Sequence, residues 1–243
     1  FKEVIDSTFH SQKGMISVHK SADKWYFEIP DTLLNSDIMA VTRYSKVAPG
    51  AGVFGGEEVN RQLIRWEKGP NQNLFLRSVS LIIASADSTK PIFQAVQNSN
   101  SDPIIGVFDI KSIKNDSTGK SSVIDVTDYF NSDNQVFSLN NPKKQALKIA
   151  SFKKDASFIE KINAYPINTE IRTVRTFNVT PPAMTPSPVP SVGKYMPAGL
   201  HAGVVTLEMN TSLILLPKTP MRKRLFDSRV GYFANQYTIF GEE

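Results

Sequence analysis

Short runs of alternating apolar and polar residues, separated by polar turns, constrain the fold of this chain more than any other sequence feature. From Trp25 to Ile29, large apolar side chains alternate with Tyr26 and Glu28, so an extended backbone would place the two sets on opposite faces. A similar run occupies residues 15–19. The two runs and the polar residues between them predict a β-hairpin.

Further segments alternate or are rich in β-branched and aromatic residues, and turn-forming residues separate most of them. We expect strands at residues 38–47, 62–67, 74–84, 104–113, 122–127, 167–179, 203–216 and 230–239. This pattern predicts a mainly β (α+β) fold with few short helices. Its antiparallel sheets would form a sandwich-like structure or a curved sheet with long hairpins.

Three segments favour helix. Residues 31–34 follow Pro30 and suggest a helical turn, and residues 91–97 predict a short helix. Ser157 and Glu160 fit a capping box, in which each side chain satisfies a free backbone N–H at a helix start. We therefore also expect a helix that begins at Ser157.

A proline-rich stretch separates the last two long strands. Residues 181–197 contain six prolines, and each proline removes a backbone donor and fixes φ. We expect an exposed loop that joins a long hairpin. Tyr195 in this loop is a candidate for an exposed contact, because loop residues often carry function.

Composition excludes several classes of site. The chain has no cysteine, so it offers no disulfide, thiolate metal ligand or thiol nucleophile. Its net charge of +5 is spread along the sequence, whereas nucleic-acid binding needs a concentrated basic face. No apolar run is long enough to span a bilayer. Residues 1–5 lack the pattern of a signal peptide, so the protein is cytoplasmic or its signal peptide has been removed.

The glycine-rich stretch at residues 49–56 contains a G-x-G-x-x-G pattern and has two interpretations. A phosphate-binding loop would have to open a helix, and Glu57 and Glu58 would repel the anion at that point. The residues from Leu63 to Trp66 instead indicate a strand. We therefore favour a turn between two strands.

Catalytic motifs are absent from the sequence. His10, His19 and His201 are not spaced as in the zinc motif H-E-x-x-H, and no G-x-S-x-G pentapeptide marks a nucleophilic serine. A carboxylate pair of the glycosidase kind stays open, because two such groups can meet from anywhere in a fold. Trp25 and Trp66 fit core or cross-strand positions better than a binding platform. We expect this chain to be no enzyme by itself and to hold no cofactor or metal.

Four cations and one carboxylate lie among large apolar residues between Met221 and Phe233. Together with Lys218 they either form an anion-binding patch or belong to an edge strand whose charges discourage unwanted pairing until a neighbouring domain covers it. We favour the covered edge. The candidate interdomain contacts are Arg222, Arg224, Asp227, Arg229 and Tyr232.

Several stretches, in this order, resemble the N-terminal region of a family of secreted, Bacteroidetes-type bacterial zinc-dependent metalloproteases. They are GMISVHKSADKWYFEIP, APGAGVFGGEEVNRQLIRWE, DASFIEKINAYPINTEIRTVRTF and MRKRLFDSRVGYF. The resemblance implies two domains of unknown function, a small β unit at residues 1–50 and a larger antiparallel β domain at residues 57–243.

The same resemblance implies a non-catalytic region that packs against and supports a downstream catalytic domain of the same polypeptide. Zinc would belong to that missing domain, and the protein would be secreted, periplasmic or on the cell surface. An inhibitory pro-region that uses Asp227 is a variant of this role. The alternative is a stand-alone extracellular module that binds polysaccharide or peptide through the proline-rich loop and exposed aromatic residues.

Overall fold

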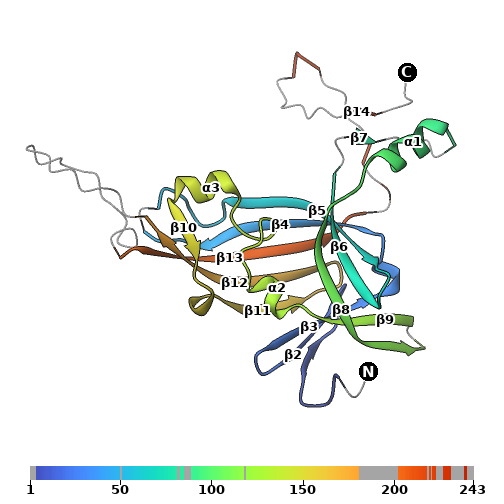
Figure 1. Ribbon diagram of the computed structural model, residues 1–243, viewed down its shortest axis with the longest axis horizontal. Helices are drawn as coiled ribbons and strands as arrows, with labels where there is room; N and C mark the ends of the chain where they lie inside the picture. The colour runs from blue at the N-terminus through green and yellow to red at the C-terminus, as the bar shows by residue number, and fades with distance from the viewer. Residues whose placement is uncertain are drawn as a thin grey trace, which may run out of the picture.

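The fold is built almost entirely of antiparallel β-structure. The computed structural model describes residues 4–49, 51–80, 83–84, 89–117, 119–180, 202–217, 219, 221–222, 227–230 and 238–239. Within these residues lie one open twelve-stranded antiparallel sheet, a two-stranded parallel sheet and three short α-helices (Figure 1). The predicted mainly β fold class is therefore confirmed.

The large sheet contains strands of three to thirteen residues. They are β1 (His10–Gln12), β2 (Ser17–Ser21), β3 (Lys24–Pro30), β4 (Asp37–Lys46), β5 (Glu58–Lys68), β6 (Asn73–Val79), β8 (Ile104–Asp116), β9 (Gly119–Asp125), β10 (Ile149–Phe152), β11 (Phe158–Ala164), β12 (Asn168–Val179) and β13 (Val204–Leu215). The strands β7 (Ile83–Ala84) and β14 (Thr238–Ile239) form the separate parallel pair.

The strand order brings distant parts of the sequence together. It runs β1-β2-β3-β9-β8-β6-β5-β4-β13-β12-β10, and β11 also pairs with β12. The sheet curls so that its first strands lie beside β11 (Figure 1). There the backbone N–H of Met15 donates to the carbonyl oxygen of Tyr165 at 2.7 Å, and that of Ala164 donates to Gln12 Oε1 at 3.2 Å.

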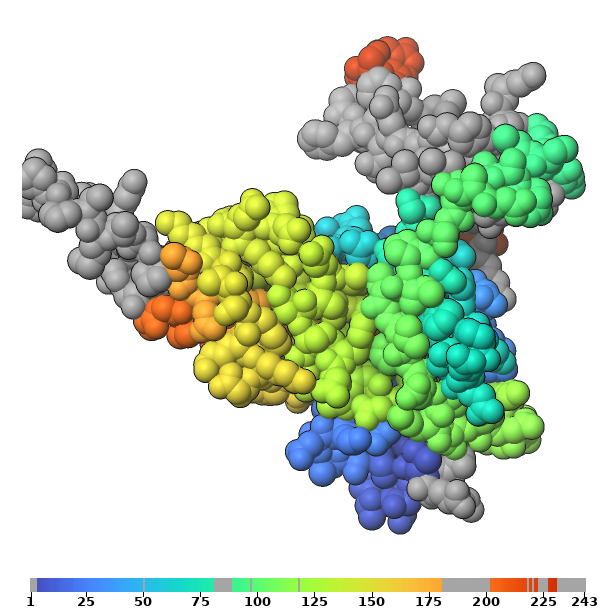
Figure 2. Space-filling view, viewed as in Figure 1, coloured from blue at the N-terminus to red at the C-terminus, as the bar shows by residue number. Residues whose placement is uncertain are grey.

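Short helices connect and cover the sheet. They are α1 (Pro91–Ser99), α2 (Thr127–Phe130), α3 (Asn141–Ala146) and the 3₁₀ turns η1 (Asp31–Leu33) and η2 (Lys154–Ala156). The segment from α2 to α3 crosses one face of the sheet, as the yellow-green surface of Figure 2 shows. Its Phe130 and Phe137 are buried in the main apolar core, and their rings lie 5.2 Å apart. Helix α1 stands off from the sheet (Figures 1 and 2).

Several expected elements are confirmed. The strands β2 and β3 form the predicted hairpin, in which Trp25, Phe27 and Ile29 are buried. The segments η1 and α1 occur where helix was expected, and the antiparallel strands β12 and β13 form the predicted long hairpin. The expected strand at residues 74–84 is divided into β6 and β7.

The predicted helix at Ser157 is wrong, because residues 158–164 form strand β11 against β12. The Ser157 hydroxyl donates to the carbonyl oxygen of Lys153 at 2.7 Å and accepts from the backbone N–H of Thr176 at 3.0 Å. Its oxygen thus binds a neighbouring strand instead of a helix start. The capping-box pattern failed because tertiary pairing to β12 overrides the local preference.

The expected strand at residues 230–239 is wrong at its start and confirmed at its described C-terminal end. Residues 228–230 form a turn, closed by a hydrogen bond from the Val230 N–H to the Asp227 carbonyl oxygen at 3.0 Å. Of the residues in this range that the structure describes, Thr238 and Ile239 are in a strand and Val230 is not. Residues 231–237 lie outside the described part.

Strands from both predicted domains belong to one sheet. Strand β3 pairs with β9, and β4 lies between β5 and β13. Backbone hydrogen bonds therefore connect residues before 47 to residues after 57 at two places, between β3 and β9 and on either side of β4. The division at residues 50–57 stays a prediction about domains.

Candidate functional site

A row of polar side chains crosses five neighbouring strands at one end of the sheet. We call it the polar row, and it consists of Ser11 on β1, His19 on β2, Glu28 on β3, Ser121 on β9 and Lys114 on β8. The five strands are adjacent in the order β1-β2-β3-β9-β8. The row therefore runs perpendicular to the strands.

Strand register places these residues on one face. Ser11 lies directly opposite His19, and Lys114 lies directly opposite Ser121. His19 faces Tyr26, so Glu28 is its diagonal neighbour two residues further along β3. Directly opposite and diagonal positions of an antiparallel pair are within reach of long side chains. The sheet geometry thus accounts for the contacts along the row.

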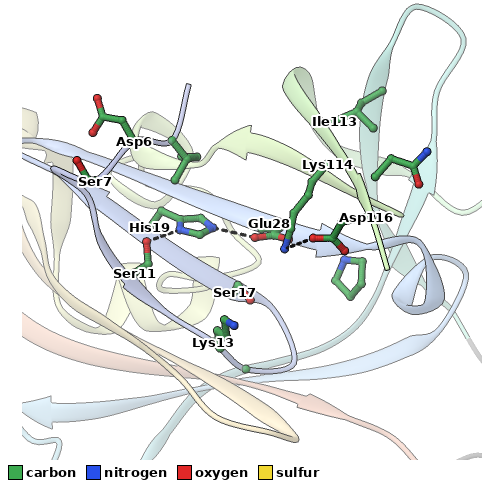
Figure 3. Close-up of a pocket in the computed structure, with 14 residues that line it drawn as sticks. Asp6, Ser7, Ser11, Lys13, Ser17, His19, Glu28, Ile113, Lys114 and Asp116 are labelled. Carbon is green, nitrogen blue, oxygen red and sulfur yellow. Dashed lines mark hydrogen bonds and ion pairs between the residues drawn. The ribbon is translucent and has the colours of Figure 1, made fainter. Parts of the chain in front are cut away.

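Hydrogen bonds connect the members of the row, and Figure 3 shows those that join Ser11, His19 and Glu28. His19 Nδ1 lies 2.8 Å from Ser11 Oγ, and His19 Nε2 lies 3.1 Å from Glu28 Oε2. The second carboxylate oxygen, Oε1, accepts from Ser121 Oγ at 2.7 Å and from Lys114 Nζ at 3.3 Å. Both oxygens of Glu28 are therefore satisfied although the side chain is largely buried.

The environment stabilises Glu28 as a carboxylate. The hydrogen bond from His19 lowers the pKa of Glu28 most; burial opposes it, and Ser121 and Lys114 add to the lowering, which brings that pKa to about 2. Burial works against a charged Lys114, but Glu28 and Asp116 outweigh it and raise the pKa of Lys114. The row thus contains a carboxylate and an ammonium at neutral pH.

Four members of the polar row, all except Ser121, line a hollow of about 1280 Å³ (Figure 3). Ser11 is exposed in this hollow, whereas His19 is only 6% exposed. Asp6 and Ser7 line it from the segment before β1, and Lys13 lines it just after β1. Lys13 forms no ion pair with any residue in the described ranges. The hollow therefore offers a hydroxyl and an ammonium above a buried imidazole.

The sequence-predicted contact residues lie elsewhere. Arg222 is exposed, and Arg229 donates to Asp227 through Nε at 2.9 Å and through Nη2 at 2.6 Å. Neither Arg222 nor residues 227–230 form the expected edge strand. Arg224, Tyr232 and Tyr195 lie outside the described residues, as do Lys218 and His201.

The fold also places the glycine-rich stretch and the two tryptophans. The glycine-rich stretch connects antiparallel strands β4 and β5 and opens no helix, in agreement with the expected turn. Trp25 and Trp66 are buried in the core. Among the residues that the structure describes, no three His, Asp or Glu side chains are grouped so that they could hold a metal ion. None of the helices described here has the length and apolar character needed to cross a membrane.

Sequence reasoning missed the polar row. The search for a nucleophilic serine relied on a pentapeptide around it, and the search for histidine partners relied on short spacings. Ser11 and His19 are eight residues apart and meet only because β1 pairs with β2. The sequence did predict the β2–β3 hairpin, which contains His19 and Glu28. The register of that hairpin, and of β1 against β2, would have been needed to bring Ser11, His19 and Glu28 together.

Two family models match the chain. The one described as a domain of unknown function (DUF5117) matches residues 56–243, and the one described as a domain of unknown function (DUF5118) matches residues 1–47. No curated protein and no solved structure matches it.

Proposed function

The chain belongs to the family described as a domain of unknown function (DUF5117), and we propose that it is the N-terminal region of a secreted zinc-dependent metallopeptidase. In this role it packs against a downstream catalytic domain of the same polypeptide, supports that domain and contributes no zinc ligand. The protein would act outside the cytoplasm, in the periplasm, at the cell surface or after secretion.

Sequence resemblance supports this proposal. The stretches that resemble the metalloprotease family extend from residue 14 to residue 233 and occur in the family's order. They include residues of the sheet strands, such as NRQLIRWE in β5 and NTEIRTVRTF in β12.

The observation that carries the proposal is the exposed surface beyond β13. Met221 is 79% exposed and Val230 is 51% exposed, although both are large apolar side chains. Arg222 and the ion pair between Asp227 and Arg229 lie in the same segment. Protein interfaces combine an apolar centre with charged residues at the rim, so this segment suits contact with another domain.

The first test is to read the gene beyond Glu243. The proposal expects a sequence that encodes His-Glu-x-x-His within the next few hundred residues, in the same reading frame. A stop codon directly after Glu243, or a downstream region without this motif, contradicts the proposal.

The second test uses the whole polypeptide. Met221→Asp together with Val230→Asp should lower the thermal midpoint of the polypeptide and speed proteolytic release of the catalytic domain. Phe54→Asp is the matched control, because Phe54 is 71% exposed in the loop between β4 and β5. Equal effects of the double variant and the control would show that residues 221–230 contact no neighbouring domain.

The second candidate is a stand-alone module that binds polysaccharide or peptide. The hollow at the polar row favours it, because its volume suits a small ligand and it combines an apolar surface with polar side chains such as Asp6, Lys13 and Asn115. The same gene sequence separates the two candidates, since a stand-alone module requires no peptidase domain.

A further inference from the structure

We propose that the hollow is an acyl-transfer site in which Ser11 is the nucleophile, His19 is its general base and Glu28 orients His19. Its substrates would be small carboxylic esters. This activity goes beyond the proposed supporting role, because it uses residues of this chain alone and no metal.

The hydrogen-bond chain fixes the direction in which a proton moves. An ionised Glu28 can only accept hydrogen bonds, so His19 Nε2 must carry a hydrogen and donate it to Oε2. In a neutral imidazole the other nitrogen, Nδ1, is then an acceptor. The Ser11 hydroxyl, 2.8 Å away, is left to donate to Nδ1. This is the contact through which a base removes the proton of a serine nucleophile.

The three side chains have the roles of a Ser-His-acid triad, which is recognised by geometry and not by sequence position. The two imidazole nitrogens are exchanged relative to chymotrypsin, because Nδ1 faces the serine here and Nε2 faces the acid. The chemistry requires only that one nitrogen accepts a proton while the other donates to the carboxylate. Both conditions are met.

Accessibility is arranged as a nucleophilic site requires. Ser11 is exposed on β1, a strand at the edge of the sheet, and its side chain lines the hollow. His19 is buried beneath it and held from the far side by Glu28. A substrate in the hollow can therefore reach the hydroxyl, while the base stays in a fixed orientation.

Lys13 supplies a charge that complements the reaction. It lies two residues after Ser11, lines the same hollow and has no ion-pair partner among the described residues. When an ester carbonyl is attacked, negative charge develops on its oxygen, and a nearby ammonium stabilises that charge. We assign Lys13 this role.

The reaction balances without a cofactor. Ser11 Oγ forms a bond to the carbonyl carbon while its proton passes to His19 Nδ1. The bond from that carbon to the alkoxy oxygen then breaks, and the leaving alcohol takes the proton from Nδ1. A water molecule releases the acid from Ser11 by the same sequence, which regenerates the hydroxyl and the neutral imidazole.

The test measures hydrolysis of p-nitrophenyl acetate by the purified 243-residue chain in the presence of EDTA. We expect release of p-nitrophenol above the rate in buffer, with an initial burst from the acyl-enzyme. Ser11→Ala should abolish the burst and the turnover. Because Ser11 is exposed, this variant should keep its fold, which thermal melting verifies. Ser151→Ala is the matched control and should keep full activity, because Ser151 is an exposed serine on β10, at the opposite edge of the sheet, and does not line the hollow.

Glu28 is tested as a positioning residue. Glu28→Gln should reduce kcat by at least about tenfold and change the pH profile, with KM little affected, because the base loses the group that orients it. Glu28→Asp should restore part of kcat. Two results overturn the proposal: no hydrolysis above the rate in buffer, or hydrolysis that persists unchanged in Ser11→Ala.

Discussion

Arg175 and His19 are both buried polar side chains on strands of the same sheet, and both make hydrogen bonds that leave their own strand. Arg175 on β12 is 1% exposed. Its Nη2 donates to the carbonyl oxygen of Phe130 at 3.2 Å, its Nη1 donates to that of Ser132, and its Nε donates to Thr173 Oγ1 at 3.3 Å. We call these four residues the Arg175 cluster.

The two groups differ in what surrounds them. The Arg175 cluster is closed over by α2 and the residues that follow it, whereas the polar row ends at a hydroxyl that is exposed in a hollow. Burial lowers the pKa of Arg175 to about 10, although the charge of Asp133 opposes this, so the guanidinium stays charged at neutral pH. A buried, hydrogen-bonded polar side chain can therefore either stabilise the fold or orient a reactive group. The polar row differs from the Arg175 cluster in that one of its side chains is accessible from a hollow.

The largest expected effect comes from breaking the closed cluster. Arg175→Met should lower the free energy of unfolding by about 3 kcal/mol, because two carbonyl oxygens lose their donor in the core. Urea denaturation measures this loss. Arg175→Lys should lose less stability, because the lysine ammonium can replace some of the hydrogen bonds that the guanidinium donates. A neutral or stabilising Arg175→Met would mean that the cluster does not hold α2 against β12.

The polar row should show its contribution through pH. The pKa of Glu28 is lower in the folded chain than in the unfolded one, so its stabilisation is complete above about pH 4.5 and is lost as the pH falls toward 2. Between pH 5 and pH 2 the wild type should lose up to roughly 3 kcal/mol more stability than Glu28→Gln. Denaturation curves at several pH values give this difference. Parallel curves for the two proteins would contradict the assigned role of Glu28.

A smaller effect is expected where the chain around Gly14 packs against the backbone of Tyr165, beside the polar row. A Cβ on Gly14 would lie 2.7 Å from the backbone nitrogen and from the carbonyl oxygen of Tyr165. Gly14→Ala should therefore cost about 1–3 kcal/mol in unfolding free energy, because backbone must shift to admit the methyl group. Gly55→Ala, whose Cβ would lie 3.2 Å from the carbonyl oxygen of Ser45, is the control and should cost less. Equal losses of stability in Gly14→Ala and Gly55→Ala would show that the backbone around Tyr165 shifts at little cost.

The smallest effect is expected at an exposed ion pair. Lys154 Nζ lies 3.4 Å from Asp128 Oδ1, and both side chains are mostly exposed. Lys154→Ala should change the unfolding free energy by less than about 0.5 kcal/mol. Lys144→Ala is the contrast, because Lys144 pairs with Asp133 at a largely buried position. A larger loss of unfolding free energy for Lys154→Ala than for Lys144→Ala would contradict the expectation that a buried ion pair contributes more to stability than an exposed one.

Local patterns predicted much of the fold. Alternation located the β2–β3 hairpin and most strands of the sheet, because half-buried strands repeat every two residues. Alternation does not report partners, so the pairing of β3 with β9, about a hundred residues later, was not predicted. The same limit explains the failure at Ser157, where the partner of β11 and not the local sequence decided the structure.

The candidate site was less predictable than the fold. Each member of the polar row comes from a different strand, and Ser121 and Lys114 join it only through the pairing of β9 with β3 and β8. The sequence around His19 alone does not indicate that this histidine belongs to a hydrogen-bonded network. Only the register of three or more strands shows that Ser11, His19 and Glu28 share one face.

The most direct test of the difference between the two groups is the mapping of a fluorophosphonate probe on the folded 243-residue chain. The probe bonds covalently to serine hydroxyls that a neighbouring base activates, and peptide mass spectrometry locates the adduct. We predict one adduct, on Ser11, formed more slowly in Glu28→Gln and at an unchanged rate in Arg175→Lys. Absence of the adduct, or equal labelling of Ser7 and Ser11, would contradict the account.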